Sequence, residues 1–230
     1  MKTLFFSIVL GLLAFSGTVL KASSEESDPG AAVPTGVSDF LKEWAGAGMR
    51  RDPRALKTLV HPEILAEFSD ANRDFFEYTF SHELLLPLTE RYRIEECIPY
   101  SEDLTPLLAD VFDYPVQPSH RLKIIYRTPG GETVEAMRDI ARKDGTWYLV
   151  YPVPDEESLR LFRRSGAAEM KEKELAALLY RELDDPLKTE LEELAADGKI
   201  EEAALLYSGR TGHFPGVSRR VAALIEKQEN

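Results

Sequence analysis

The stretch RLKIIYRTPGGETVEAMRDIARKDGTWYLVY, residues 121–151, decides the fold of this 230-residue chain. Two turn sequences, Pro129-Gly130-Gly131 and Lys143-Asp144-Gly145, separate three runs rich in β-branched and aromatic residues. Apolar side chains alternate along each run, as in strands with one buried face: Leu122, Ile124 and Tyr126, then Val134, Ala136 and Ile140, then Trp147, Leu149 and Tyr151. The stretch predicts a three-stranded antiparallel meander.

The flanking sequence favours an α+β fold. Alternation over Tyr92–Ile98 predicts a further strand. Helices are expected before it, over 37–50, over 54–60 and from an N-cap at Asp70 to Pro87, with a short helical patch over 104–112 behind it. After Pro154 the spacing of apolar residues predicts helices alone. We therefore expect two regions, an α+β domain over 37–153 and an all-helical appendage over 154–230.

The order of these elements resembles the nuclear transport factor 2-like superfamily. The likeness covers about 37–153 and rests on Phe40-Leu41-x-x-Trp44, on Asp52-x-x-Ala55-Leu56 and on the ending Asp144-Gly145-Thr146-Trp147-Tyr148-Leu149-Val150. The resemblance implies helices packed on a strongly curved antiparallel sheet, a cone-like shape with a cavity at its wide end. It implies little about activity, because the superfamily contains isomerases, dehydratases, hydrolases and binding modules.

The C-terminal region carries a second likeness. Residues 197–226 are similar to the helix-turn-helix of the ribosomal stalk protein's C-terminal domain, through Asp197-Gly198-Lys199 and Gly212. The chain departs from that pattern at Glu201, where an apolar residue is expected, and in the long turn before Pro215. Ala203 and Tyr207 also suit a tetratricopeptide helix, although no second copy follows at that period. We carry no partner over from either likeness.

The first 22 residues predict export. Lys2 precedes the apolar run TLFFSIVLGLLAFSGTVL, and small residues follow, with Ala22 or Ser16 as the residue before the cut. The alternative is an uncleaved helix that anchors the chain, since about 18 apolar residues approach the length of a membrane span. The chain has no cysteine near this run, which excludes a lipid-modified N-terminus. Residues 23–36 have the composition of a flexible acidic linker.

Charge and cysteine content limit the partners. The formal charge is -12, and removal of Lys2 and Lys21 with a signal peptide would change it to -14. Such a chain should repel nucleic acids and anionic membrane surfaces. Cys97 is the one cysteine, so no intramolecular disulfide can form, and we expect it to be a buried apolar residue.

Metal and catalytic motifs are weak. The four histidines show no metal-ligand spacing, and His82-Glu83 lacks a second histidine because Leu86 occupies that position. We predict no metal and no cofactor. The candidates for acid-base chemistry in an apolar cavity lie beside or between the strands: Asp110, Asp113, His120 and Asp139. Structural roles are the stronger expectation, with Arg138 and Asp139 as a solvent-facing pair and no catalytic residue assigned.

Aromatic residues on the expected inward faces give a better lead: Trp44, Phe75, Phe76, Tyr92, Tyr126 and Trp147. From these we predict four ligand-binding residues, Trp44, Tyr92, Tyr126 and Trp147, with ordinary core packing as the alternative. The sequence favours an exported, non-enzymatic module that binds a small apolar ligand or an envelope protein. The alternative is a small metal-independent isomerase or dehydratase that acts on an apolar substrate in the cone cavity.

Overall fold

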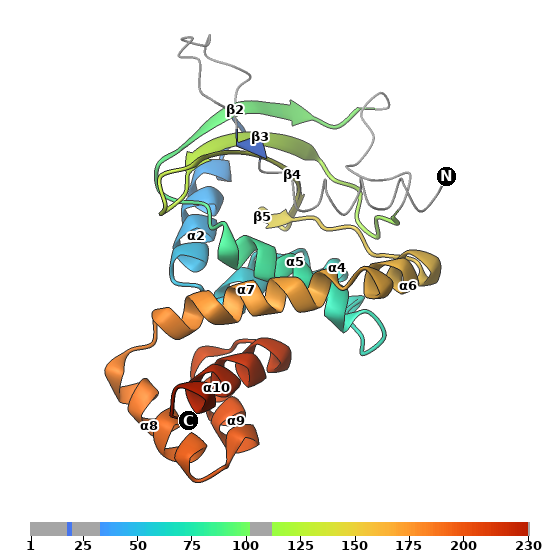
Figure 1. Ribbon diagram of the computed structural model, residues 1–230. Helices are drawn as coiled ribbons and strands as arrows, with labels where there is room; N and C mark the ends of the chain where they lie inside the picture. The colour runs from blue at the N-terminus through green and yellow to red at the C-terminus, as the bar shows by residue number, and fades with distance from the viewer. Residues whose placement is uncertain (1–17, 20–32, 102–111, 230) are drawn as a thin grey trace.

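The computed structural model describes residues 18–19, 33–101 and 112–229 and shows an α+β fold. Its antiparallel sheet contains β2 (Tyr92–Pro99), β3 (His120–Arg127), β4 (Thr133–Lys143) and β5 (Thr146–Leu149). β3 lies between β2 and β4, and β5 pairs with the far edge of β4, as does the two-residue strand β1 (Thr18–Val19). The predicted meander is therefore confirmed, with β2 as its additional strand (Figure 1).

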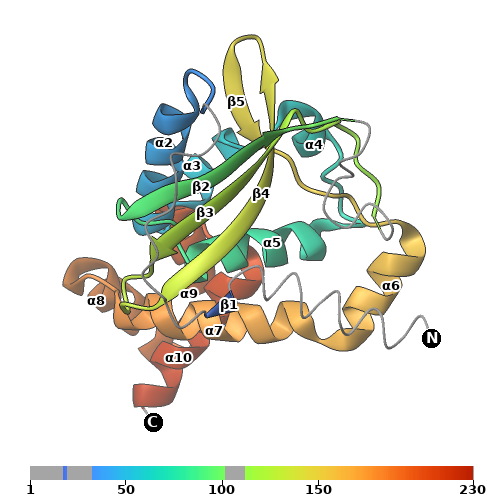
Figure 2. The same ribbon diagram turned by 90° about the horizontal axis from the view of Figure 1, so that it is seen from above.

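The two turns hold the register of the meander. Tyr126 pairs with Val134 across the first turn, where the Thr128 amide donates to the Glu132 carbonyl and the Thr128 carbonyl accepts from the Gly131 amide. Asp144 and Gly145 both have positive φ, 50° and 87°, as a tight two-residue hairpin turn of the primed type requires. Figure 2 shows β2, β3 and β4 side by side, and the sheet is not strongly curled. The strongly bent, cone-like form implied by the resemblance is thus not part of the fold described here.

Among the described residues, four helices lie between β1 and β2: α2 (Val37–Met49), α3 (Pro53–Thr58), α4 (Pro62–Ala66) and α5 (Arg73–Leu85). Asp52 caps α3 by accepting hydrogen bonds from the backbone of Arg54 and Ala55. The predicted cap at Asp70 is wrong. Asn72 closes the preceding turn by accepting a hydrogen bond from the Ser69 amide, so α5 begins after Asn72, and Asp70 pairs with Arg73 instead.

The other helices differ from the expectations in the cap of α2 and in the presence of α4. The sequence favours Ser38 or Asp39 as the N-cap of the helix expected over 37–50, but Gly36 is the N-cap of α2. The short helix α4 was not expected, and it forms because His61 accepts a hydrogen bond from the Glu63 amide and Pro62 occupies its first position. The predicted patch over 104–112 falls mainly on 102–111, outside the described residues.

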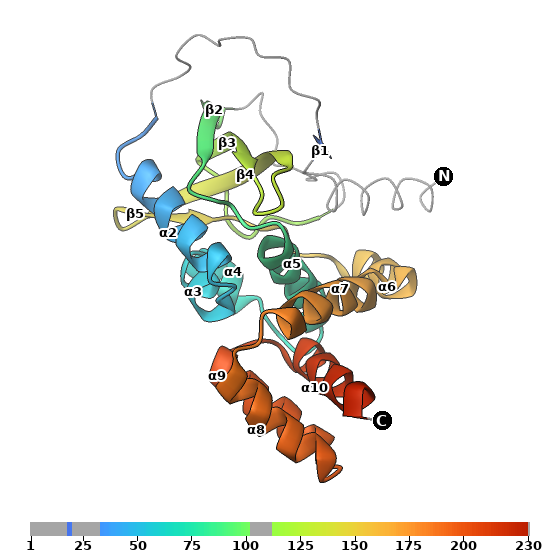
Figure 3. The same cartoon turned by 60° about the vertical axis from the view of Figure 1, so that its left-hand side comes forward.

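The C-terminal region is helical, as predicted: α6 (Glu156–Ser165), α7 (Ala167–Arg181), α8 (Asp185–Ala196), α9 (Ile200–Thr211) and α10 (Pro215–Glu229). α7 packs on α5 and on α10, so α5 and α7 lie between the sheet and the α8–α10 group (Figures 1 and 3). One hydrophobic cluster contains Leu122 of the sheet, Leu175 of α7 and Val221 of α10. The core is therefore continuous across residue 153, and the division of the chain there stays a prediction.

None of the described helices combines the length and apolar character that crossing a membrane requires.

Candidate functional site

Two of the predicted ligand residues lie deep between α2 and the sheet. Trp44 is 2% exposed and Tyr126 is 5% exposed. The Tyr126 hydroxyl donates a hydrogen bond to the Leu86 carbonyl at 2.9 Å, and burial raises the pKa of this tyrosine to about 12. The guanidinium carbon of Arg138 lies 5.5 Å from the Trp44 ring centroid, a cation–π contact. Arg138 therefore contacts the Trp44 ring, and the Leu86 carbonyl contacts the Tyr126 hydroxyl.

A buried ion pair forms the centre of this region. Arg138 of β4 contacts the Glu83 carboxylate of α5 at 2.8 Å, and the Tyr151 hydroxyl donates to the same carboxylate oxygen at 3.5 Å. The Glu83 and Arg138 side chains are 4% and 10% exposed. The expectation that Arg138 and Asp139 face solvent is wrong. Adjacent strand residues point to opposite faces, and Asp139 is buried on the other face, 3.0 Å from Arg121.

The other two predicted ligand residues lie away from this ion pair. Tyr92 of β2 is partly buried, and its hydroxyl donates to the Ser38 carbonyl at 3.4 Å. Trp147 of β5 is 5% exposed and donates from Nε1 to the Thr35 carbonyl at 3.0 Å. The structure thus places Trp44 and Tyr126 around Arg138 and ties Tyr92 and Trp147 to the segment that enters α2. The assignment of a ligand to these four aromatics stays a prediction.

The acid-base candidates occupy different environments. Asp110 lies outside the described residues. Asp113 is exposed and holds Val153 through two backbone hydrogen bonds. His120 packs edge-on against Trp147, and burial lowers its pKa. With Asp139 paired to Arg121, the structure gives these residues no common cavity in the part of the chain that it describes. No cluster of three potential metal ligands occurs among the described residues.

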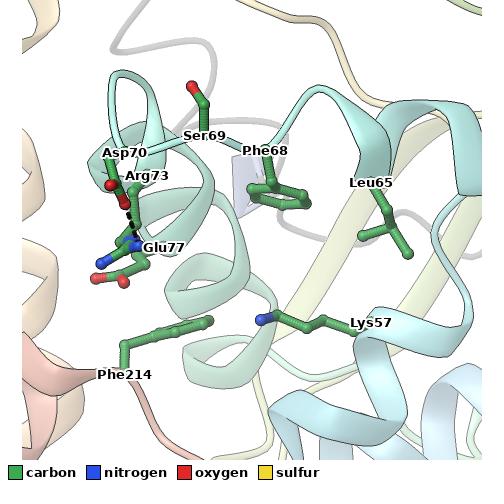
Figure 4. Close-up of a pocket in the computed structure, with 8 residues that line it drawn as sticks. All are labelled: Lys57, Leu65, Phe68, Ser69, Asp70, Arg73, Glu77 and Phe214. Carbon is green, nitrogen blue, oxygen red and sulfur yellow. Dashed lines mark hydrogen bonds and ion pairs between the residues drawn. The ribbon is translucent and has the colours of Figure 1, made fainter.

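A cavity of about 630 Å³ opens instead between α3, α4, α5 and the turn that leads into α10. We call it the Glu77 cavity. Its walls combine three apolar side chains with one ion pair and two single charges (Figure 4). Its lining residues are Lys57, Leu65, Phe68, Ser69, Asp70, Arg73, Glu77 and Phe214. Figure 4 shows Lys57 on one side and Arg73 with Glu77 on the other, with Phe68 and Phe214 between them.

Glu77 has the most perturbed carboxyl group of this cavity. Burial raises its pKa to about 7, and the negative charge of Glu172 on α7 adds to the increase. Arg73 and Lys57 act in the opposite direction but do not reverse the shift. Within the described ranges, no hydrogen bond or ion pair reaches the Glu77 carboxylate. A partly buried carboxylate without a partner is costly for the protein, and a ligand can remove that cost.

A second cavity of about 590 Å³ lies between α2 and the first hairpin turn. It is lined mainly by polar groups and turn backbone: Ala45, Gly46, Met49, Thr89, Glu90, Arg91, Arg127, Thr128, Pro129 and Gly131. We prefer the Glu77 cavity because aromatic and polar groups converge there, as they do in small-molecule sites.

Sequence reasoning missed every residue of the Glu77 cavity. One signal was present: Glu77 interrupts the aromatic run Phe75-Phe76-Glu77-Tyr78 on a predicted helix. A carboxylate among large apolar residues points to partial burial. Neither Lys57 nor Phe214 carries such a signal, because each reaches the cavity through the packing of distant helices. Comparisons of the chain with known protein families, curated proteins and solved structures give no match.

Proposed function

We propose that this chain is a non-enzymatic binding protein whose small-molecule ligand occupies the Glu77 cavity. The observation that carries the proposal is the Glu77 carboxylate, partly buried and without a hydrogen-bonding partner among the described residues, beside aromatic side chains. The volume of the Glu77 cavity, about 630 Å³, falls in the range typical of ligand sites. Structural carboxylates elsewhere in this fold, such as Glu83, are paired instead.

The test is a cavity-filling variant. In Figure 4 the Leu65 side chain extends toward Lys57 across the cavity, so Leu65→Trp should narrow it. The matched control is Ile98→Trp, which adds an indole at a position on β2 that is 38% exposed. The full chain is screened by thermal shift against small apolar, cationic and anionic compounds. Hits that Leu65→Trp weakens and Ile98→Trp leaves intact support the proposal; hits unaffected by Leu65→Trp contradict it.

A second candidate function is supported by the same carboxyl group. A carboxyl whose pKa is about 7 is suited to act as a general acid or base near neutral pH. The alternative is therefore a metal-independent isomerase or dehydratase for an apolar substrate. Glu77→Gln separates the two: loss of turnover with retained substrate affinity supports an enzyme, whereas loss of ligand affinity without any turnover in the wild type supports a binding protein.

We also propose membership of the nuclear transport factor 2-like superfamily for 37–153, with a sheet less curled than the cone that the resemblance implies. The order of helices and meander supports this proposal. Export is proposed on the N-terminal sequence alone, with an envelope protein as an alternative partner to a small ligand. Intact-mass analysis of the native protein tests export, because cleavage would leave a chain that begins near Ser23 or Gly17, while an anchored chain would retain Met1 to Leu20 in the membrane fraction.

A further inference from the structure

We infer that the Glu77 cavity selects an organic amine, with the protonated nitrogen on the Glu77 carboxylate and the apolar body against Phe68 and Phe214. This inference rests on the proposed function and names its ligand class. Three features support it: the pairing of the neighbouring carboxylates, the aromatic walls and the negative net charge of the chain.

The carboxylates around Glu77 each have their own cationic partner. On the same helix, Asp74 pairs with Arg163 at 2.7 Å. In the preceding turn, Asp70 pairs with Arg73. On α7, Glu172 pairs with Arg220 of α10 at 3.1 Å.

Glu77 is the exception among these four. Arg73 is committed to Asp70, and Lys57 lies over the Phe214 ring, 5.6 Å from its centroid, without an ion pair in the described part of the chain. A cationic group of a ligand would give the Glu77 carboxylate an ion-pair partner. A charge-assisted hydrogen bond in such a partly desolvated place is among the stronger polar contacts that a ligand can make.

The aromatic walls suit the remainder of such a ligand. Phe68 packs on Phe76 and Phe80, and Phe214 packs on Phe80 at 5.9 Å between ring centroids, so both aromatic walls of the cavity rest on the same buried Phe80 ring. The contact of Lys57 with Phe214 shows that this ring face already accepts a cation. A phenyl or alkyl body would bury apolar area here while its ammonium group reaches Glu77.

The net charge of the chain opposes an anionic ligand, since the formal charge is -12. The charges next to Glu77 have both signs: Glu172 and Asp74 add negative potential, and Arg73 and Lys57 add positive potential. An anionic ligand could use Lys57 or Arg73, but both are exposed, and exposed ion pairs contribute little. Selection for a cation therefore follows from the buried carboxylate, and the test includes the anion as a competing outcome.

The experiment compares three probes with one phenyl body: 2-phenylethylamine, 2-phenylethanol and 3-phenylpropionate. Isothermal titration of the full chain at pH 8 should show the amine binding at least about tenfold more tightly than the alcohol, since it gains a charge-assisted hydrogen bond. Glu77→Gln should abolish this preference. The control Glu96→Gln, on exposed β2, should retain it.

A second measurement needs no variant. Amine binding requires the charged form of Glu77, so at pH 7 it should release protons to the buffer, and affinity should rise from pH 6 to pH 8. Titrations in buffers of different ionisation enthalpy measure that release. The other charged groups near Glu77 are Lys57, Arg73, Asp70, Asp74 and Glu172.

The outcomes separate this inference from the proposed function. If the alcohol or the propionate binds as tightly as the amine or more tightly, the inference that the cavity selects an amine is wrong. If Leu65→Trp weakens binding of these probes, the proposed binding cavity would still be supported. Binding of the amine without proton release, or with its preference intact in Glu77→Gln, also overturns the inference. No binding of the amine at millimolar concentration overturns it as well.

Discussion

Replacement of Glu83 by Gln should be among the most destabilising conservative changes in this protein. The Glu83 carboxylate contacts Arg138 at 2.8 Å and 3.0 Å, and both side chains are almost fully buried. Glutamine keeps the shape but removes the charge. Arg138 cannot release its proton, so its guanidinium would remain charged in the interior without a counterion.

The expected loss in the free energy of unfolding follows from leaving the Arg138 charge buried without its partner. Breaking one partner of a buried ion pair costs about 3 to 5 kcal/mol, because the other charge is left uncompensated. A double variant, Glu83→Leu with Arg138→Met, removes both charges and fills the same space with apolar atoms. Such replacements are often neutral or stabilising, so the double variant should be clearly more stable than Glu83→Gln.

Urea unfolding at pH 7 measures both effects. The control is Glu63→Gln, whose exposed carboxylate pairs with Lys143 at 2.9 Å and whose loss should leave the free energy of unfolding unchanged within error. A cost for Glu83→Gln below about 1 kcal/mol would refute the reasoning, since that is the range of solvated pairs. It would mean that water reaches Arg138, and the predicted pocket around Trp44 and Tyr126 would then be open.

Three further predictions concern packing, pH and backbone conformation. Trp147→Ala should lower the free energy of unfolding by about 3 to 5 kcal/mol, because the side chain is 5% exposed; a much smaller loss in urea unfolding would indicate a pocket beside it. Burial lowers the pKa of His82 to about 3 from an ordinary 6.5, so the unfolded state binds this proton first and stability should fall as pH decreases through that window. His82→Gln should flatten this slope in unfolding curves taken from pH 7 to pH 4, and an unchanged slope would assign it to other groups. Gly212→Ala should lower the melting temperature more than Gly198→Ala. Both glycines have positive φ, but a Cβ at 212 would lie 2.6 Å from Arg54 Nε, whereas a Cβ at 198 would face open space. Equal shifts in melting temperature would contradict the steric argument.

The strands were predictable because their signals are local. Alternation and turn chemistry act over a few residues, and the pairing of β3, β4 and β5 follows from them directly. The same alternation also indicates the burial of one charged residue. Arg138 shares the inward register of Val134, Ala136 and Ile140, so its burial was implied by the pattern that predicted the strand. The error came from the assumption that a charged pair must face solvent.

The candidate site was not predictable in the same way. Lys57, Glu77 and Phe214 come from α3, α5 and the turn before α10, and nothing in their local sequences says that these segments meet. Helix starts posed a smaller problem of the same kind. Asp70 has the chemistry of a cap, but Asn72 forms the hydrogen bond that closes the turn. Competing polar groups a few residues apart are resolved by the geometry of the turn, which composition does not encode.

The C-terminal helices have a role that follows from the position of Phe214. This residue lies 5.9 Å from Phe80 between ring centroids and supplies one wall of the Glu77 cavity, while Arg54 of α3 donates to the Gly209 carbonyl at 2.8 Å. The cavity therefore exists in full only when the C-terminal group is packed against α3 and α5. A ligand that binds the complete cavity and not its separated walls must stabilise that packing by its own binding free energy. Under the proposed binding function, ligand binding would therefore stabilise the packing of the C-terminal helices on α3 and α5. This effect does not depend on any surface that these helices present to other molecules.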